Sequence, residues 1–179
     1  MKIPVLTFIL VIFADIAAAQ VYLTRNAKVT FFSETPLENI EATNNTASSL
    51  INTTTDSVLV KIKNTAFTFK NALMQDHFNE NYMESSKYPI SIFRGKISRK
   101  PDYSKDGSYH VTATGRMSIH GVERMITIGG ILSVKGSELN LFSEFTVKPT
   151  DYRINIPKLV FNKIAEEVKV TFNSSYQKK

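Results

Sequence analysis

The sequence predicts an all-β protein: a single antiparallel eight-stranded barrel with one short helix, preceded by a signal peptide. Most of the chain consists of segments in which apolar and polar residues alternate, rich in β-branched and aromatic residues and joined by short turns. Eight or nine such strands in succession are typical of an antiparallel barrel or sandwich. Because the chain shows neither an internal repeat nor a linker, residues 20–179 are expected to form one domain.

Residues 1–19 have the layout of a secretory signal. Lys2 is followed by an apolar run from Ile3 to Phe13 and then by the small residues Ala17-Ala18-Ala19. The apolar run is too short to span a bilayer, which takes ~20 residues. We therefore expect cleavage after Ala19 and export. The chain contains no cysteine, and an exported protein without disulfides fits a bacterial periplasm best.

The first half of the expected domain contains four strand candidates, separated by a polar loop at Asn44-Asn45 and a turn at residues 53–56. The candidates are Val21–Phe32, Leu37–Ala42, Ala47–Asn52 and Ser57–Phe69. In the last of these the alternation changes parity near Asn64, which predicts a bulge or bend.

Residues 70–85 follow a different period. Leu73, Met74, Phe78 and Tyr82 lie at spacings that place them on one face of a helix. The segment ends before Pro89. A single helix in an all-β chain is expected to pack across the sheet or to close one end of it.

Five further strands are expected after the helix: Ile90–Ser98, Tyr109–Ile119, Val122–Val134, Glu138–Val147 and Val168–Phe172. Small residues interrupt the apolar sides of two of them, with Ala113 and Gly115 on one strand and Gly130 on the next. An eight-stranded barrel can either fill itself with side chains or enclose one ligand. Small inward residues favour a ligand cavity, and a filled core remains the alternative.

Motifs of the common catalytic and metal sites are missing. The sequence contains no Gly-x-Ser-x-Gly, no phosphate-binding loop and no His-Glu-x-x-His, and His77, His110 and His120 match no metal-ligand spacing. We expect no catalytic residues, no metal and no cofactor. The net charge of +6 comes from scattered lysines and arginines, which argues against nucleic-acid binding and leaves transient contact with an anionic membrane surface open.

Three segments resemble the YceI-like family: Leu73–Ile97, Tyr109–Gly130 and Phe145–Ile154. The first joins a helix to Tyr-Pro and a strand, the second is a strand–turn–strand with Gly115 and Gly121, and the third contains Asp151. The resemblance implies a lipocalin-like barrel, without enzymatic activity, that holds an isoprenoid-chain lipid or similar amphiphile. It also suggests a homodimer. The chain departs from the family pattern at Pro149-Thr150, where Arg-Ser is expected, and at Arg153, where Gly is expected.

The leading hypothesis is therefore a periplasmic carrier of an apolar chain lipid. Tyr88, His120 and Arg124 are candidates for polar groups at the mouth. The candidate apolar lining is Val60, Ile62, Phe67, Phe69, Leu73, Met74, Phe78, Tyr82, Phe93, Val111, Ala113, Met117, Ile126, Ile128, Leu141 and Phe145. Two alternatives remain: a non-catalytic protein-interaction module with a filled barrel core, and a hydrolase or isomerase that uses His77 or His120.

Overall fold

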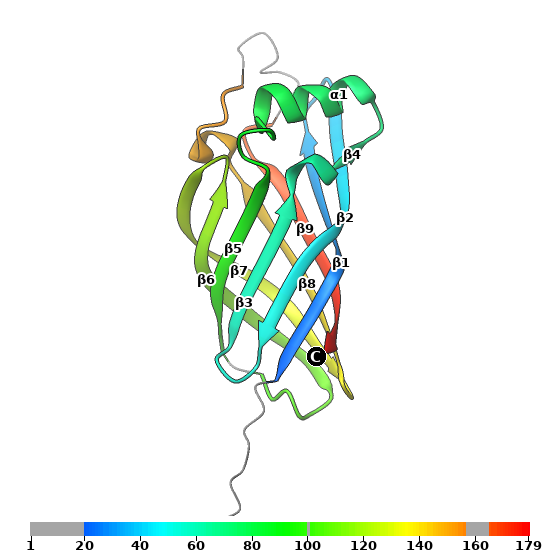
Figure 1. The fold of residues 1–179 in the computed structure, drawn as a ribbon, viewed down its shortest axis with the longest axis vertical. Helices are drawn as coiled ribbons and strands as arrows, with labels where there is room; N and C mark the ends of the chain where they lie inside the picture. Colours follow the sequence, from blue (N-terminus) through cyan, green and yellow to red (C-terminus); the bar gives the residue numbers. More distant parts are fainter. Residues whose placement is uncertain (1–19, 100, 157–164) are drawn as a thin grey trace, which may run out of the picture.

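A computed structural model describes residues 20–99, 101–156 and 165–179 (Figure 1). The expected signal peptide lies outside the described residues. Among the helices that the structure describes, none is long and apolar enough to cross a bilayer.

Eight strands of the described chain close into an antiparallel barrel, as the sequence predicts. Neighbouring strands pair in the order β1-β9-β8-β7-β6-β5-β3-β2, and pairing of β1 with β2 closes the ring. A ninth strand, β4 (Thr68–Phe69), adds two residues beside β2. The barrel strands are β1 (Val21–Glu34), β2 (Asn39–Asn52), β3 (Ser57–Lys63), β5 (Ile90–Ser98), β6 (Gly107–Ile119), β7 (Val122–Lys135), β8 (Glu138–Val147) and β9 (Val168–Lys178).

The polar loop predicted at Asn44-Asn45 is wrong, because β2 runs through it as one strand. The register between β1 and β2 shifts on either side of Ala27, so these asparagines mark an irregular stretch of the ladder. Asn44 is fully buried there. Its Nδ2 donates to the carbonyl of Lys63 at 2.9 Å, and its Oδ1 accepts from the backbone N–H of Thr46 at 2.8 Å. This buried asparagine therefore hydrogen-bonds the backbone of both β2 and β3.

The parity change near Asn64 is a short 3₁₀ helix, η1 (Asn64–Ala66), rather than a bulge. It separates β3 from β4, which is why Phe67 and Phe69 have the opposite parity to Val58 and Val60. The last strand, β9, extends beyond Phe172 to Lys178. The expected bounds of β5 and β8 agree with the structure.

The predicted helix is present in two parts that form a cap across one end of the barrel (Figure 1). It begins as α1 (Ala72–His77), where the Asn71 side chain accepts a hydrogen bond from the N–H of Leu73 at 2.9 Å. It continues as one π-helical turn, η2 (Phe78–Tyr82). Residues 72–83, which include Met83 directly after the turn, are called the cap below.

The opposite end of the barrel is filled by its own side chains. Tyr176, Ile51, Leu132 and Leu139 are completely buried there. The hydroxyl of Tyr176 lies 2.7 Å from Oγ of Ser49, which itself donates to the carbonyl of Leu59 at 3.1 Å. A buried hydroxyl needs such a partner, so this pair lets a large side chain fill the closed end without an unpaired polar atom.

Candidate functional site: an apolar cavity beneath the cap

A cavity of about 420 Å³ lies between the cap and the barrel wall. Its size falls within the ~300–1,000 Å³ range of ordinary ligand pockets. Strands β1, β8 and β9 supply much of the wall, and the cap supplies the roof. The lining consists of Val29, Phe31, Ser33, Glu38, Ile40, Ile62, Asn64, Phe67, Phe69, Asn71, Leu73, Met74, His77, Phe78, Tyr82, Met83, Ser91, Met117, Ile119, Phe145, Val147, Pro149, Ile154, Ile156, Val168 and Val170.

Four phenylalanines from different elements meet at the junction of cap and wall. The ring of Phe31 lies 5.2, 5.6 and 5.4 Å, centre to centre, from the rings of Phe67, Phe69 and Phe78. Phe78 also lies 5.6 Å from Phe67 and 5.1 Å from Phe69. These separations are those of favourable aromatic pairs. The cluster holds the cap on β1 and presents a large apolar surface to the cavity.

Several polar residues of the lining are already hydrogen-bonded within the protein. Asn64 donates from Nδ2 to the carbonyl of Tyr88 at 2.6 Å and accepts at Oδ1 from the hydroxyl of Ser91 at 2.9 Å. Oγ of Ser33 accepts from the N–H of Ala165 at 2.8 Å. Burial raises the pKa of Tyr82 above its ordinary value, so that phenol is neutral near pH 7. Because Asn64, Ser91 and Ser33 already have partners within the protein, the cavity lining offers a ligand mainly apolar contact.

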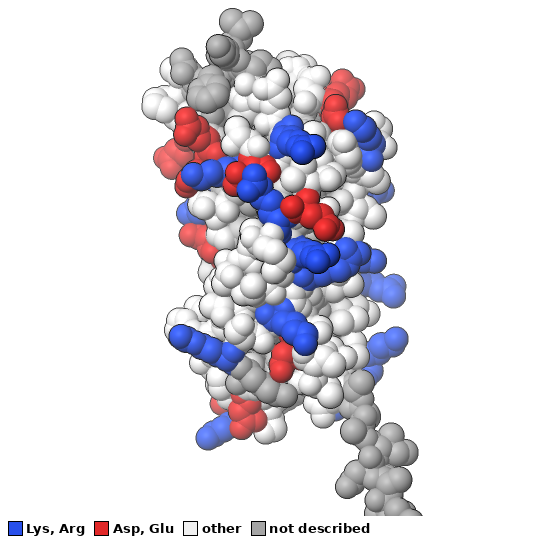
Figure 2. Space-filling model, turned by 90° about the vertical axis from the view of Figure 1, so that its left-hand side faces the viewer, with Lys and Arg blue, Asp and Glu red and all other residues white. Residues whose placement is uncertain are grey.

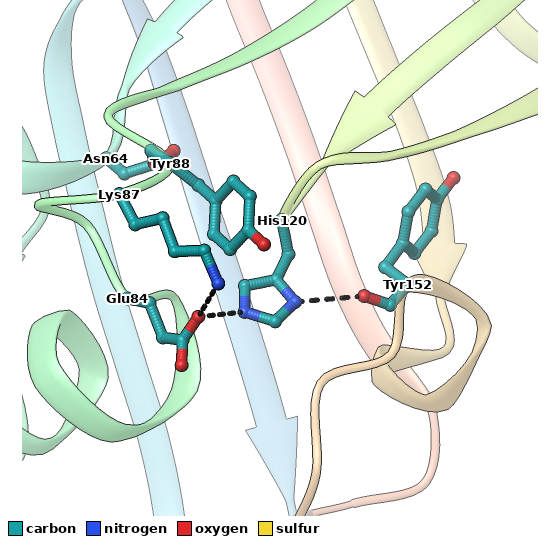
Figure 3. Close-up of polar contacts among 6 residues, drawn as sticks. All are labelled: Asn64, Glu84, Lys87, Tyr88, His120 and Tyr152. Atoms are coloured by element: carbon teal, nitrogen blue, oxygen red, sulfur yellow. Dashed lines mark hydrogen bonds and ion pairs between the residues drawn. The ribbon is translucent and has the colours of Figure 1, made fainter.

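The cap is tied to the barrel by a polar cluster that surrounds His120 (Figure 3). Nε2 of His120 lies 3.4 Å from Oε2 of Glu84, just after the cap, and Nδ1 lies 3.1 Å from the carbonyl of Tyr152. Tyr152 belongs to a third short helix, η3 (Pro149–Tyr152). The ring of Tyr88 packs on the imidazole at 4.5 Å. His120, from the β6–β7 turn, thus contacts both the segment that follows the cap, through Glu84, and the helix η3, through Tyr152.

Nine of the sixteen predicted lining residues do line the cavity: Ile62, Phe67, Phe69, Leu73, Met74, Phe78, Tyr82, Met117 and Phe145. The other seven are not part of its lining: Val60, Phe93, Val111, Ala113, Ile126, Ile128 and Leu141. They belong to the packed interior of the barrel, as buried or partly buried members of its core. Ligand binding by either group stays a prediction.

The small inward residues do not open the cavity, contrary to the reasoning from sequence. A Cβ on Gly115 would overlap the backbone of Arg94 and Gly95, so this glycine allows strands β5 and β6 to approach closely. A Cβ on Gly130 would lie 2.7 Å from the carbonyl oxygen of Phe142. Neighbouring backbone occupies the space that the missing side chains leave.

Sequence reasoning missed the contribution of β1. Val29, Phe31 and Ser33 all line the cavity. Val29 and Phe31 share one parity within the predicted strand Val21–Phe32, and Ser33 continues it just beyond the expected end, so the alternation contained the information. What the pattern could not show is which stretch of the inward side faces the cavity.

The proposed mouth residues Tyr88, His120 and Arg124 are outside the lining as well. Arg124 instead pairs with Asp151, with Nη2 3.2 Å from Oδ1 and Nε donating to the backbone carbonyl at 2.7 Å. Of the histidines, His77 lines the cavity. Among the described residues, no three His, Cys, Asp or Glu side chains gather in a way that could hold a metal ion.

Residues 21–176 match the model of the YceI-like domain family. Comparison with curated proteins gives no match.

Several solved structures share the fold. A polyisoprenoid binding domain from Saccharophagus degradans, implicated in plant cell wall breakdown, has 16% identity and a TM-score of 0.75, covering 90% of this chain and 99% of its own. BcnA from Burkholderia cenocepacia has 17% identity and a TM-score of 0.71, covering 83% and 95%. The YCEI protein of Campylobacter jejuni has 12% identity and a TM-score of 0.59, covering 100% and 99%. At these identities the likeness establishes the fold.

Proposed function

Because the chain belongs to the YceI-like family, we propose that it binds and carries an isoprenoid-chain lipid or a similar amphiphile in the cavity beneath the cap. The observation that supports this most directly is the cavity itself, which is apolar and bounded by the phenylalanine cluster. A polyisoprenoid binding domain of the same fold points to the same class of ligand. The expected signal peptide adds a periplasmic location to the proposal.

The volume of the cavity limits the length of chain that it can enclose. At ~30 Å³ per water-sized group, 420 Å³ has room for about fourteen such groups. That corresponds to roughly three isoprene units. Each methylene removed from water contributes ~0.8 kcal/mol, so affinity for such a chain requires few polar contacts. The remainder of a longer chain, or a polar head, would extend out of the cavity, and Leu73 of the cap is a lining residue that is also 60% exposed.

The placement of the histidines favours ligand binding over catalysis. The histidine that contacts a carboxylate, His120, lies outside the cavity lining and contacts segments that hold the cap. His77 does line the cavity, and an enzyme that used it would require a second reacting group beside it. We propose no enzymatic activity. The protein-interaction alternative would need the interior filled throughout, as it is around Tyr176.

The test is to fill the cavity from its wall. Val170 lies in β9 opposite Phe31 on one side and Phe145 on the other, and all three line the cavity. We expect Val170→Trp to abolish binding of a fluorescent apolar probe. The matched control is Thr171→Trp, since the next residue along the strand points outward.

The same variants are compared after organic extraction and mass spectrometry. A lipid co-purified with the unmodified protein and with Thr171→Trp, and absent from a folded Val170→Trp, supports the proposal. Absence of any extractable lipid, together with unchanged probe affinity in Val170→Trp, would contradict it.

A further inference from the structure

Three neighbouring strands carry an unbalanced set of charges. Strands β3, β5 and β6 are adjacent in the barrel. Their outward positions contain five exposed cations and no Asp or Glu: Lys61, Lys63, Arg94, Lys96 and Arg116. We call this surface the basic face. Blue atoms gather at mid-height towards the right-hand side of Figure 2, where red atoms are few.

Two of these cations are held side by side. Arg94 lies directly opposite Arg116 in the β5–β6 ladder, next to the glycine pair Gly95 and Gly115 that brings the strands together. Like charges directly opposite each other destabilise a sheet. None of the five cations forms an ion pair within the described residues. Glu123, on the neighbouring strand β7, lies opposite Ser118 and does not pair with either arginine. An external anion would relieve this repulsion.

Apolar side chains flank the two arginines. The register aligns Leu59, Arg94, Arg116 and Met125 across four strands, and Met125 is 65% exposed. Ile90, at the cap end of β5, is 47% exposed. Cations bordered by exposed apolar residues suit the boundary between lipid head groups and acyl chains. The outward positions of the basic face carry no Phe, Tyr or Trp, the large aromatic side chains on which nucleic-acid bases stack.

We propose that the basic face docks the protein on the surface of an anionic phospholipid bilayer. The barrel then lies with β3, β5 and β6 against the head groups. Their end at Lys63 and Ile90 leads to the cap, beneath which the cavity lies. This inference rests on the proposed function and adds to it the membrane surface at which the protein would take up or release its lipid. The docking itself depends only on the charges of the face and can be tested whether or not the cavity holds a lipid.

The experiment measures co-sedimentation of the protein with vesicles of phosphatidylcholine alone and with vesicles containing one third phosphatidylglycerol. We expect binding to the anionic vesicles only, and loss of that binding at high salt. In Arg94→Gln/Arg116→Gln the partition coefficient should fall roughly twenty-fold or more, since each cation near an anionic surface contributes about five-fold. The matched control, Lys28→Gln/Lys178→Gln, removes the same charge from β1 and β9 on another side of the barrel.

Three outcomes would overturn the inference: an equal loss in both double variants, equal binding to neutral and anionic vesicles, or no vesicle binding by the unmodified protein. Capture of an acidic protein in place of vesicles would also count against it. Circular dichroism confirms that each variant is folded. Binding of the apolar probe by Arg94→Gln/Arg116→Gln should be unchanged, so a failure of docking leaves the proposed function standing and a failure of lipid binding leaves the docking result standing.

Discussion

Nε2 of His120 lies 3.4 Å from Oε2 of Glu84, and this contact joins the β6–β7 turn to the segment that follows the cap. The other ring nitrogen, Nδ1, lies 3.1 Å from the carbonyl of Tyr152. The carbonyl of Tyr152 is a hydrogen-bond acceptor, whereas the carboxylate of Glu84 lies within ion-pair distance of Nε2 without hydrogen-bond geometry. Lys87 places its Nζ 3.6 Å from the same carboxylate oxygen of Glu84 (Figure 3).

Removal of His120 should loosen the cap more than removal of the Glu84 charge. Glu84→Gln removes the charge of a partly exposed carboxylate that pairs with Lys87, and should cost less than ~1 kcal/mol in the free energy of unfolding. His120→Ala also removes the contact with Tyr152 and the packing on Tyr88, and should cost ~1–3 kcal/mol. Urea unfolding measures both costs. Hydrogen exchange of the backbone amides of residues 78–88 should be faster in His120→Ala than in the unmodified protein. An unchanged exchange rate in this segment would show that His120 does not hold the cap.

Phe31 should matter for binding as well as for stability. Its ring contacts three others and faces the cavity, so Phe31→Ala removes apolar lining and the support of the cap together. A large-to-small change at a fully buried phenylalanine costs ~3–5 kcal/mol, and this half-buried one should fall near the lower end of that range. Probe affinity should fall at least ten-fold. Phe32→Ala, at the adjacent outward position, is the control and should leave probe affinity unchanged.

The close approach of β5 and β6 makes Gly115 intolerant of substitution. Gly115→Ala drives a methyl group into the backbone of Arg94 and Gly95, which cannot rotate away as a side chain could. We expect a loss of ~1–3 kcal/mol or more, as in overpacked cores. Nothing lies within 4 Å of a Cβ placed on Gly129, so Gly129→Ala should be neutral or stabilising by a few tenths of a kcal/mol. Equal stability of the two variants in urea would show that the strands do not approach so closely.

Chain length should reveal the capacity of the cavity. In a series of straight-chain alcohols, affinity should rise about four-fold for each added methylene, which is the equivalent of ~0.8 kcal/mol. The increase should level off near fourteen carbons, when about 420 Å³ is filled. Probe displacement measures the series. Affinity that kept rising well beyond that length would mean that the ligand occupies another site.

Buried tyrosines should make the fold sensitive to alkali. Burial raises the pKa of Tyr176, and burial followed by the negative charge of Asp56 raises the pKa of Tyr103. A raised folded-state pKa means that the contribution to stability is complete below the unfolded value, ~10, and is lost as the pH rises above it. Stability should therefore fall above about pH 10. Phenolate absorbance of these two tyrosines should appear only when the protein unfolds. In the double variant Tyr176→Phe/Tyr103→Phe, the free energy of unfolding should decrease less steeply above about pH 10. Full phenolate absorbance of the folded protein would contradict this.

Several elements of the fold could be predicted from the sequence because they depend on the local periodicity of apolar residues. Alternation defined β5 and β8, and the helical spacing of Leu73, Phe78 and Tyr82 defined the cap. The Asn44-Asn45 loop was wrong because polarity alone does not distinguish an exposed loop from a buried asparagine whose amide pairs with Lys63. Arg153 takes a left-handed conformation, φ 55°, where the family resemblance expects Gly.

The sequence by itself determined the class of fold and the inward side of strands with regular alternation, such as β6, β7 and β8, because alternation of side chains along a strand is local and has a fixed period. Only the tertiary structure decided where the interior is empty. Gly115 and Ala113 could not reveal this, because the space beside a small residue is open or occupied according to how neighbouring strands and the cap pack around it. The cavity forms where Phe31 of β1 meets Phe78 of the cap, residues far apart in the chain that closure of the barrel brings to 5.4 Å.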